Sequence, residues 1–444
     1  MLPETRYARR GDIHVAYQVL GEGETDLVLV SEWFGHLEAR WDIPSVDRFL
    51  RRLSSSSRVI SFDKYGIGLS DSAPPGSLPP LEEWMDDVRA VMDAARSERA
   101  VILGAGDGGT MAAMFAASYP DRASSLILVN STARLSWAPD YPIGLPAERQ
   151  EMLIQLVEQT WGTAELLTAI NPSLAHLPRA QPEVARALRL AASPATAAAV
   201  IRMLFQLDIR PILPSIRVPT LVMHRRDNEI LTIDHGRYLA DHIEGARFVE
   251  LPGADYVVGI GDVDSVVDEI QEFLTGTPAA IDTDRVLATV LFTDIVGSTE
   301  RSAELGDQRW RDVLDAHDQL ADRQLARYRG TLVKATGDGL VATFDGPARA
   351  IWCALAFRDG LRSLGVEIRG GVHCGEIERR GPDVSGLAVH IAARVQAEAR
   401  PGEVLVTRTV KDLVAGAQIA FVDRGPHALK GVPDEWQLYA VGGG

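Results

Sequence analysis

The sequence has little cysteine, no long apolar run and a shortage of positive charge. Only 2 of its 444 residues are cysteines, which argues against a disulfide framework and suits a reducing compartment. No apolar stretch approaches the roughly 18 residues that a membrane-crossing helix needs. The first residues, MLPETRYARRGD, carry charges but no apolar segment of the kind found in secretory signals. We therefore expect a cytoplasmic protein with no membrane span.

The charge balance limits the partners of the chain. Asp and Glu number 61 against 45 Lys and Arg, which gives a net charge of −16. A chain this acidic repels phosphate backbones and anionic lipid, so no nucleic-acid partner is expected. With 46% hydrophobic and 24% charged residues, the composition is that of a folded globular protein. The length fits two or three domains of roughly 100–200 residues each.

Short apolar segments alternate with helical patterns over residues 1–275. This alternation predicts an α/β domain with a parallel sheet covered by helices on both faces. Residues 134–213 interrupt it with Ala- and Leu-rich helical patterns, which we interpret as a helical cap over the carboxyl edge of the sheet. Small polar residues with Gly and Pro predict a linker over 276–284. Strand and helix patterns resume over 285–444 and predict a second domain, α/β or α+β.

A glycine-rich turn stands between a strand and a helix at residues 101–110. Its centre reads Gly104-Ala-Gly106-Asp-Gly108, with small residues on both sides of position 106. This context is that of a nucleophile elbow, whose central residue adopts a strained backbone conformation. With the later run Pro252–Asp255, it makes residues 5–275 resemble the α/β-hydrolase superfamily.

The resemblance assigns three catalytic positions, and in this chain each holds a residue that does not match the catalytic residue of the family. Gly106 stands at the nucleophile position, Asn228 at the acid position and Tyr256 at the histidine position. Acyl transfer needs a nucleophile, a base and a group that orients the base. Glycine has no side chain, and a phenol with a pKa of about 10 is a poor base at neutral pH. We expect a hydrolase-like domain without hydrolysis, whose pocket binds a small apolar ligand and which senses, regulates or dimerises.

An alternative for this domain makes Asp107 the nucleophile, as in dehalogenase-type relatives. It lacks a histidine in residues 252–262 that would activate the hydrolytic water. Four ring-bearing residues after the first clear strand are candidates for the pocket lining, with core packing as the other role open to each: Trp33, Phe34, His36 and Trp41.

The second domain opens with a strand that ends in Asp294. Gly297, Ser298 and Thr299 follow at the start of a helix. Backbone amides at such a turn can cradle phosphate, while the plainer role for the aspartate is a helix cap.

A second carboxylate lies at the tip of a predicted hairpin. The run Thr336-Gly-Asp338-Gly stands between two strand-like segments. Two aspartates at adjacent strand ends offer the hard oxygen ligands that Mg²⁺ and Mn²⁺ prefer. Such a pair can hold two ions across a triphosphate.

The third element runs from Asp383 to Arg394. His390 and Arg394 are four residues apart and share one face of a predicted helix. In this order and spacing, the three elements resemble the catalytic domain of class III nucleotidyl cyclases over about 285–442. The resemblance implies an α+β domain with a ferredoxin-like core.

The resemblance also implies a role for each site residue. The metal positions are Asp294, Asp338 and the carbonyl of Ile295. The substrate positions are Gly297, Ser298 and Thr299 at the phosphates, Lys334 and Asp383 at the purine, Arg394 at the α-phosphate and Lys430 at the outer phosphates. A lysine that donates to N1 and an aspartate that accepts from the N6 amine favour ATP over GTP.

One position departs from the family pattern. His390 stands where the family often has an asparagine that positions the ribose, and we expect reduced or pH-dependent turnover. In the family, the two aspartates and the purine-binding pair come from different subunits, which implies a homodimer with composite sites. We expect an adenylyl cyclase that converts ATP to cyclic AMP and diphosphate with two Mg²⁺ or Mn²⁺ ions. The alternatives are a degenerate nucleotide-binding signalling module and a hydrolase acting through Asp107.

Overall fold

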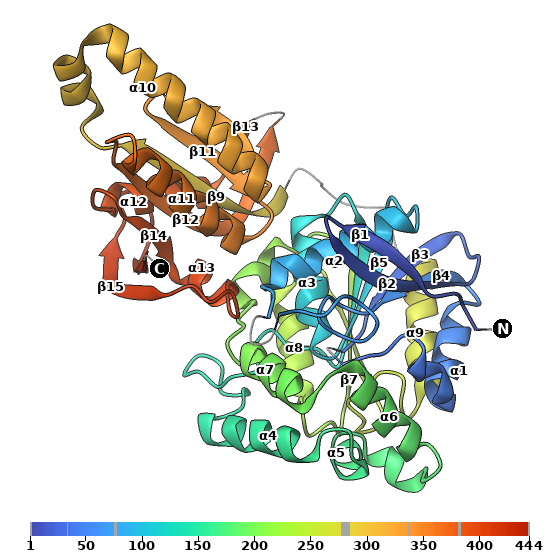
Figure 1. Cartoon of the computed structure of the whole chain (residues 1–444). Coiled ribbons are helices and arrows are strands. Elements are labelled where there is room, and N and C mark those ends of the chain that lie inside the picture. Colours follow the sequence, from blue (N-terminus) through green and yellow to red (C-terminus); the bar gives the residue numbers. More distant parts are fainter. Residues whose placement is uncertain are drawn as a thin grey trace. The chain divides into compact units, whose positions relative to one another are not determined.

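The computed structural model describes residues 2–32, 34–74, 78–276, 285–335, 337–380 and 383–442. The chain divides into two compact units, Met1–Thr283 and Asp284–Gly444, coloured blue to olive and gold to red in Figure 1. Within the described ranges, no single helix is both long and apolar enough to cross a bilayer.

The first unit is built on an eight-stranded sheet with the order β1-β2-β4-β3-β5-β6-β7-β8. The pairs among β3 to β8 are parallel, and β1 and β2 join antiparallel at one edge. Every residue of β5 is buried, which explains its unbroken apolar sequence. The strands are β1 (Arg6–Arg10), β2 (Ile13–Leu20), β3 (Thr25–Val30), β4 (Ser57–Phe62), β5 (Ala100–Ala105), β6 (Ala123–Val129), β7 (Thr220–Arg225) and β8 (Arg247–Leu251).

The helices that connect these strands are packed on the sheet. Helix α3 is buried along its whole length, which its run of Gly and Ala residues permits. A Cβ atom at Gly108 would lie 2.2 Å from the carbonyl oxygen of Ser31, so only glycine lets α3 approach the end of β3. The helices are α1 (Pro44–Leu53), α2 (Leu81–Ala94), α3 (Gly108–Ser118), α8 (Ile233–His242) and α9 (Val263–Gly276).

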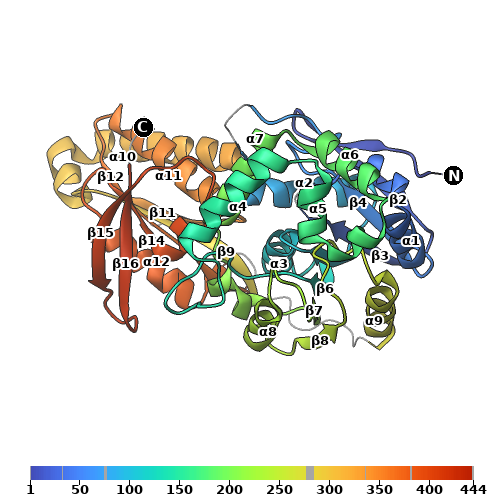
Figure 2. The same ribbon diagram turned by 90° about the horizontal axis from the view of Figure 1, so that it is seen from below.

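A helical cap is inserted between β6 and β7, as the sequence predicts. Figures 1 and 2 show its four α-helices gathered at one end of the unit. Trp161 and Val157 belong to a small hydrophobic cluster within the cap. The cap consists of α4 (Ala147–Thr160), α5 (Ala164–Ile170), α6 (Gln181–Ala191) and α7 (Pro194–Leu204), with short 3-10 turns at Pro172–His176 and Arg210–Ser215.

The second unit has a sheet of order β10-β11-β9-β12-β14-β16-β15, with β13 paired to β12. Among the described pairs, only β12 and β14 run parallel. The strands are β9 (Arg285–Ile295), β10 (Thr331–Ala335), β11 (Gly339–Phe344), β12 (Ile368–Arg380), β13 (Asp383–Ser385), β14 (Val404–Thr407), β15 (Phe421–Ala428) and β16 (Glu435–Val441).

Four helices complete the second unit. They are α10 (Ser298–Tyr328), α11 (Pro347–Arg362), α12 (Leu387–Glu398) and α13 (Arg408–Leu413). Helix α10 is interrupted at Gly306, which has a φ of +75°. A Cβ atom at Gly371 would lie 2.2 Å from the amide nitrogen of Gln396, so glycine lets α12 lie close against β12. The face of α12 that contacts β12 is buried, and the opposite face carries His390 and Arg394 into solvent.

Candidate functional site

Two aspartates of the second unit come together at neighbouring strand ends. Asp294 is the penultimate residue of β9, and Asp338 immediately precedes β11. The antiparallel register places Gly339 opposite Asp294. The amide of Ile295 donates to the carbonyl of Asp338 at 2.8 Å, which ties the two segments together. Both aspartates are partly exposed, so a ligand can reach them.

The start of α10 orients one of these carboxylates. The hydroxyl of Ser298 donates a hydrogen bond to Oδ2 of Asp338 at 2.5 Å. The preceding Gly297 has φ +63° and ψ +34°, a left-handed conformation that favours glycine. The sequence places Ser298 at the phosphates; the structure gives its side chain a contact with Asp338 as well. Thr299 lies in α10, and its side chain is outside the described part.

An arginine that the sequence analysis does not include contacts the same site. Arg369 lies opposite Asp294 in the β9–β12 register, and its Nη2 is 3.1 Å from Oδ2 of Asp294. Each side chain is 33% exposed. Directly opposed residues of an antiparallel pair project to the same face of the sheet, so the contact follows from the strand pairing. The sequence alone carries no signal for it, because the pairing of β9 with β12 is a tertiary fact.

The donor set at this site fits Mg²⁺ or Mn²⁺. Asp294 and Asp338 supply carboxylate oxygens, and water or phosphate oxygens complete the shell of such ions when proteins bind them through two carboxylates. Among the residues that the structure describes, no group of three or more His, Cys, Asp or Glu forms a cation cage.

The remaining predicted residues lie at the surface of the second unit. Lys334 is exposed on β10, and His390 and Arg394 are exposed on α12. Lys430 is exposed after β15. The described contacts do not connect any of these four side chains to Asp294 or Asp338. Asp383 begins β13, and its side chain is outside the described part.

In the first unit, the predicted nucleophile position is occupied by neighbouring side chains. Gly106 has a φ of +55° at the turn between β5 and α3. A Cβ atom there would lie 2.7 Å from the hydroxyl oxygen of Tyr256 and 2.9 Å from Cγ of Glu32. These contacts leave no room for a serine or any other nucleophilic side chain without rearrangement.

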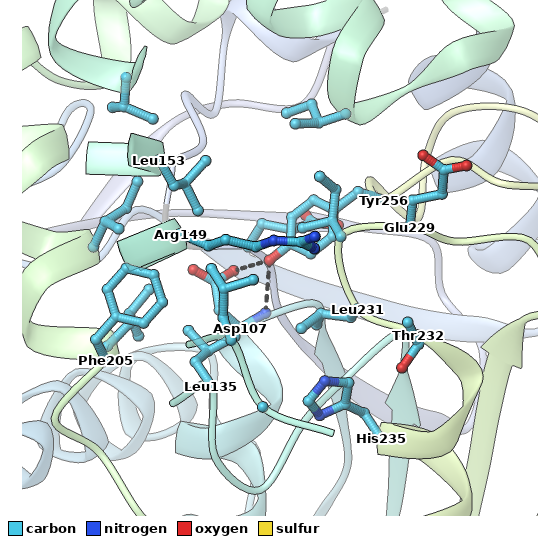
Figure 3. A pocket seen from close by; sticks show the side chains of 18 of the residues that line it. Asp107, Leu135, Arg149, Leu153, Phe205, Glu229, Leu231, Thr232, His235 and Tyr256 are labelled. Carbon is cyan, nitrogen blue, oxygen red and sulfur yellow. Dashed lines mark hydrogen bonds between the residues drawn. The ribbon is translucent and has the colours of Figure 1, made fainter. Parts of the chain in front are cut away.

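Tyr256 also occupies the position where an oxyanion would bind. Its hydroxyl donates to Oδ1 of Asp107 at 2.8 Å and accepts the Asp107 amide at 3.1 Å (Figure 3). In hydrolases of this fold, the amide of the residue after the nucleophile is an oxyanion donor. Burial, and then the nearby Asp107 carboxylate, raises the pKa of Tyr256 well above its usual value, so the phenol stays protonated.

The acid position and the alternative nucleophile Asp107 also lack a catalytic arrangement. Oδ1 of Asn228 accepts the amides of Ile230 and Leu231, both at 3.0 Å, and so shapes a turn. Asp107 has φ −70° and ψ −17°, so the strained elbow conformation belongs to Gly106 instead. This geometry argues against Asp107 as a nucleophile.

Buried charges lie beneath this turn. Asp107 is 7% exposed, and its burial raises its pKa to about 6. Lys64 is 2% exposed, and burial lowers its pKa to about 8. The Lys64 Nζ donates to the carbonyls of Ser31 and Glu32, at 2.8 and 3.1 Å.

A cavity of about 540 Å³ opens between the strand ends and the cap. Its lining is mainly aliphatic and aromatic, and its volume suits a small-molecule ligand. Of the four ring-bearing candidates, Phe34 lines the cavity, whereas Trp41 and His36 are buried elsewhere. Trp33 lies outside the described residues.

Each of the two units matches the model of a known protein family. Residues 282–443 match the adenylate and guanylate cyclase catalytic domain, and residues 41–258 match the α/β hydrolase fold. Each unit of the chain therefore matches one of these two domain families. The predicted resemblances and fold class are therefore confirmed, and the cyclase domain supports a nucleotide cyclase.

Individual relatives match one unit each. "Putative adenylate cyclase 3" of Rhizobium meliloti (strain 1021) is 30% identical over 164 residues, which cover 33% of this chain and 27% of that protein. A pimeloyl-[acyl-carrier protein] methyl ester esterase of Neisseria meningitidis serogroup C is 29% identical over 233 residues, 52% of this chain and 88% of the esterase. The enol-lactonase structure from Burkholderia xenovorans LB400 is 26% identical, with a TM-score of 0.50, and covers 61% of this chain and 100% of the lactonase. The chain thus spans about a quarter of the cyclase relative.

Proposed function

We propose that the chain is an adenylyl cyclase that converts ATP to cyclic AMP and diphosphate as a homodimer. The observation that carries the proposal is the pairing of Asp294 with Asp338 at adjacent strand ends, inside a domain that matches nucleotide cyclases. A cytoplasmic location, where ATP is available and thiols stay reduced, goes with this function.

The two aspartates and the carbonyl of Ile295 would hold Mg²⁺ or Mn²⁺. Such ions, when bound, supply Lewis-acid chemistry at the ribose 3′-hydroxyl and at the phosphates. The hydroxyl of Ser298 holds the Asp338 carboxylate in position. The backbone amides from Gly297 to Thr299, at the start of α10, would bind the phosphates. Arg369 offsets the charge of Asp294 before nucleotide binds and is then available to the triphosphate.

A second copy of the chain would complete the site. Its Lys334 and Asp383 would bind N1 and the N6 amine of adenine, which distinguishes ATP from GTP. Its Arg394 would stabilise the charge at the α-phosphate, where the 3′-oxygen bonds and the diphosphate leaves. His390 would donate to the ribose, and Lys430 would contact the outer phosphates. Four of these side chains are exposed in a single chain, which supports this assignment: Lys334, His390, Arg394 and Lys430.

The first domain would act without hydrolysis, as a ligand-binding or regulatory element. The support is the hydroxyl of Tyr256, which fills both the space at Gly106 and the oxyanion position at the Asp107 amide. An apolar cavity that remains open beside a blocked catalytic turn suits binding rather than turnover.

The proposal is tested with the purified full chain, Mn²⁺ and either ATP or GTP. Cyclic AMP should form and exceed cyclic GMP. Asp338→Asn should lower the rate about a hundredfold or more, because it removes a metal ligand while keeping the side-chain shape. Asp315→Asn, an exposed change on α10, is the matched control and should leave the rate unchanged. Cyclic GMP as the main product, or full activity in Asp338→Asn, would contradict the proposal.

One observation favours a second candidate function. His390 stands where the ribose-positioning asparagine is usual, so a nucleotide-binding module without turnover is the alternative. ATP and Mn²⁺ binding without product would support it, and recovery of cyclic AMP formation in His390→Asn would identify the histidine as the cause.

A further inference from the structure

One face of helix α4 points into the cavity of the first domain. Arg149, Leu153 and Val157 follow one another at intervals of four residues and all line the cavity. Trp161, at the carboxyl end of the helix, continues the row. Residues four apart share one side of a helix, and Figure 3 shows Arg149 and Leu153 extending into the cavity from the cap. This face of α4 therefore offers a ligand one cationic group followed by an apolar row.

The guanidinium of Arg149 is available to a ligand. Among the described residues that line the cavity, Arg149 is the only Lys or Arg. Its side chain is exposed, and within the described ranges no residue forms a hydrogen bond or an ion pair with its guanidinium. A guanidinium presents its N–H donors in a planar fork that matches the two oxygens of a carboxylate. The cap side of the cavity thus favours a ligand with a carboxylate head group.

Three carboxyl side chains line the cavity from the side of the sheet. Glu32 follows β3, Asp107 follows β5 and Glu229 follows β7. Like charges repel, so an anionic head group is disfavoured at these strand ends and favoured beside Arg149. The carboxyls therefore help to orient such a ligand, with its head group toward the cap.

The apolar row on α4 is enclosed by the other cap helices. Three lining residues from these helices pack in one hydrophobic cluster with Val157: Leu166 of α5, Leu188 of α6 and Ile201 of α7. Arg149 and Val157 are eight residues apart, so the row extends roughly 12 Å along the helix, which an alkyl chain of about eight to ten carbons would span. The cavity volume of about 540 Å³ is within the range that small ligands occupy.

We propose that this cavity binds a medium-chain aliphatic carboxylate, with the carboxylate on the guanidinium of Arg149 and the alkyl chain along α4 between the cap helices. The head group accepts charge-assisted hydrogen bonds, and the apolar lining removes the chain from water. This ligand class rests on the ligand-binding role proposed for the first domain, and it does not require cyclase activity in the second.

Isothermal titration of the full chain at neutral pH tests this ligand class with three probes that share an eight-carbon chain. These are octanoate, octanamide and octylamine, whose head groups are anionic, neutral and cationic. Octanoate should bind at least about fivefold more tightly than either of the other two. A smaller margin, or the absence of octanoate binding, would overturn the proposal.

A variant connects the binding to Arg149. Arg149→Gln, at an exposed position that should not disturb folding, should weaken octanoate binding at least about fivefold and leave octanamide binding within about twofold. Arg179→Gln is the matched control, because Arg179 is also an exposed arginine of the cap but does not line the cavity. It should leave octanoate binding unchanged.

A smaller effect of Arg149→Gln on octanoate, or an equal loss in Arg179→Gln, would overturn the proposal. Tight binding of octanamide alone would overturn the carboxylate head group and leave the ligand-binding role of the domain standing. Because the readout is the heat of binding, the result holds whether or not the chain makes cyclic AMP.

Discussion

The phenol of Tyr256 donates a hydrogen bond to Oδ1 of Asp107 at 2.8 Å, and its oxygen accepts the Asp107 amide at 3.1 Å. One side chain thus removes two parts of a hydrolase at once. It fills the space beside Gly106 where a nucleophile would stand, and it saturates the amide that would stabilise an oxyanion. Restoring hydrolysis therefore requires more than restoring a nucleophile.

Gly106→Ser should give no esterase activity and should destabilise the first domain. The new Cβ would lie 2.7 Å from the Tyr256 oxygen, and crowding of this kind costs about 1–3 kcal/mol. Hydrolysis of p-nitrophenyl butyrate and the thermal midpoint are the measurements. Gly245→Ser is the control, because Gly245 also has a positive φ, +71°, but nothing lies within 4 Å of its Cβ position. A Gly106→Ser variant as stable as Gly245→Ser, or one that hydrolyses the ester, would contradict the account.

The buried carboxyl of Asp107 should make stability depend on pH. Burial raises its pKa from 3.8 to about 6, so the folded state binds the proton more tightly than the unfolded state. Protonated Asp107 therefore favours the folded state. This contribution to stability is complete below 3.8, the pKa of the carboxyl in the unfolded chain, and is lost as the pH rises through about 6. Asp107→Asn should therefore gain stability relative to the parent chain between pH 4 and pH 7, by at most about 3 kcal/mol.

Urea unfolding at several pH values measures this difference, with the transition of the first domain identified by its response to the variant. Glu148→Gln controls for the loss of a surface carboxylate. A stability difference between Asp107→Asn and the parent that stays constant over this pH range would show that the carboxyl is not buried as described.

Ser298→Ala should weaken the metal site without abolishing it. The hydroxyl of Ser298 holds the Asp338 carboxylate at 2.5 Å, and loss of such an orienting bond typically costs about 10–100-fold in metal affinity or activity. The rate of cyclic AMP formation should be measured against Mn²⁺ concentration, and saturating Mn²⁺ should recover part of the loss. Ser302→Ala, one turn further along α10, is the control. An unchanged Mn²⁺ dependence would remove Ser298 from the site.

Arg369→Ala should have opposite effects on ion binding and on turnover. The variant frees Asp294 from an ion pair of 3.1 Å, so Mn²⁺ should bind up to about fivefold more tightly in the absence of nucleotide. Cyclic AMP formation should fall about tenfold, because a cation near the triphosphate is lost. Electron paramagnetic resonance follows Mn²⁺ binding. Arg362→Ala, which removes a looser pair of 3.9 Å to Glu367, is the control. Unchanged Mn²⁺ affinity and unchanged rate would refute the role of Arg369.

The sequence predicts which aspartates lie in the candidate cyclase site, but it does not predict which side chains contact them. Strand-end aspartates are visible as motifs, and the structure does place Asp294 and Asp338 on paired strands. The ion pair of Arg369 with Asp294 depends on the register between β9 and β12, which no local pattern specifies. The hydrogen bond of Ser298 to Asp338 depends likewise on how α10 begins beside the hairpin. Local motifs thus point to the two proposed metal ligands, whereas the groups that contact them are found only in the tertiary fold.

In the hydrolase-like domain, too, residue types are visible in the sequence, whereas their contacts are visible only in the fold. The loss of chemistry at Gly106 and Tyr256 can be read from residue types alone. The position of the Tyr256 phenol over Gly106 cannot be predicted from residue types, because 149 residues separate Tyr256 from its hydrogen-bond partner Asp107. The carboxylates that act on Lys64 are equally hidden, since they come from separate turns and from helix α2.

The most direct test of the central account is cyclic AMP formation by mixed variants. Asp294→Ala removes a proposed metal ligand and Arg394→Ala removes the cation proposed to act at the α-phosphate, so each variant should be silent alone while the parent chain is active. Mixing equal amounts should restore roughly a quarter of the parent activity, because half of the dimers then hold one intact composite site. A parent chain that makes no cyclic AMP, or an active parent whose mixed variants stay silent after subunit exchange, would contradict a composite adenylyl cyclase site.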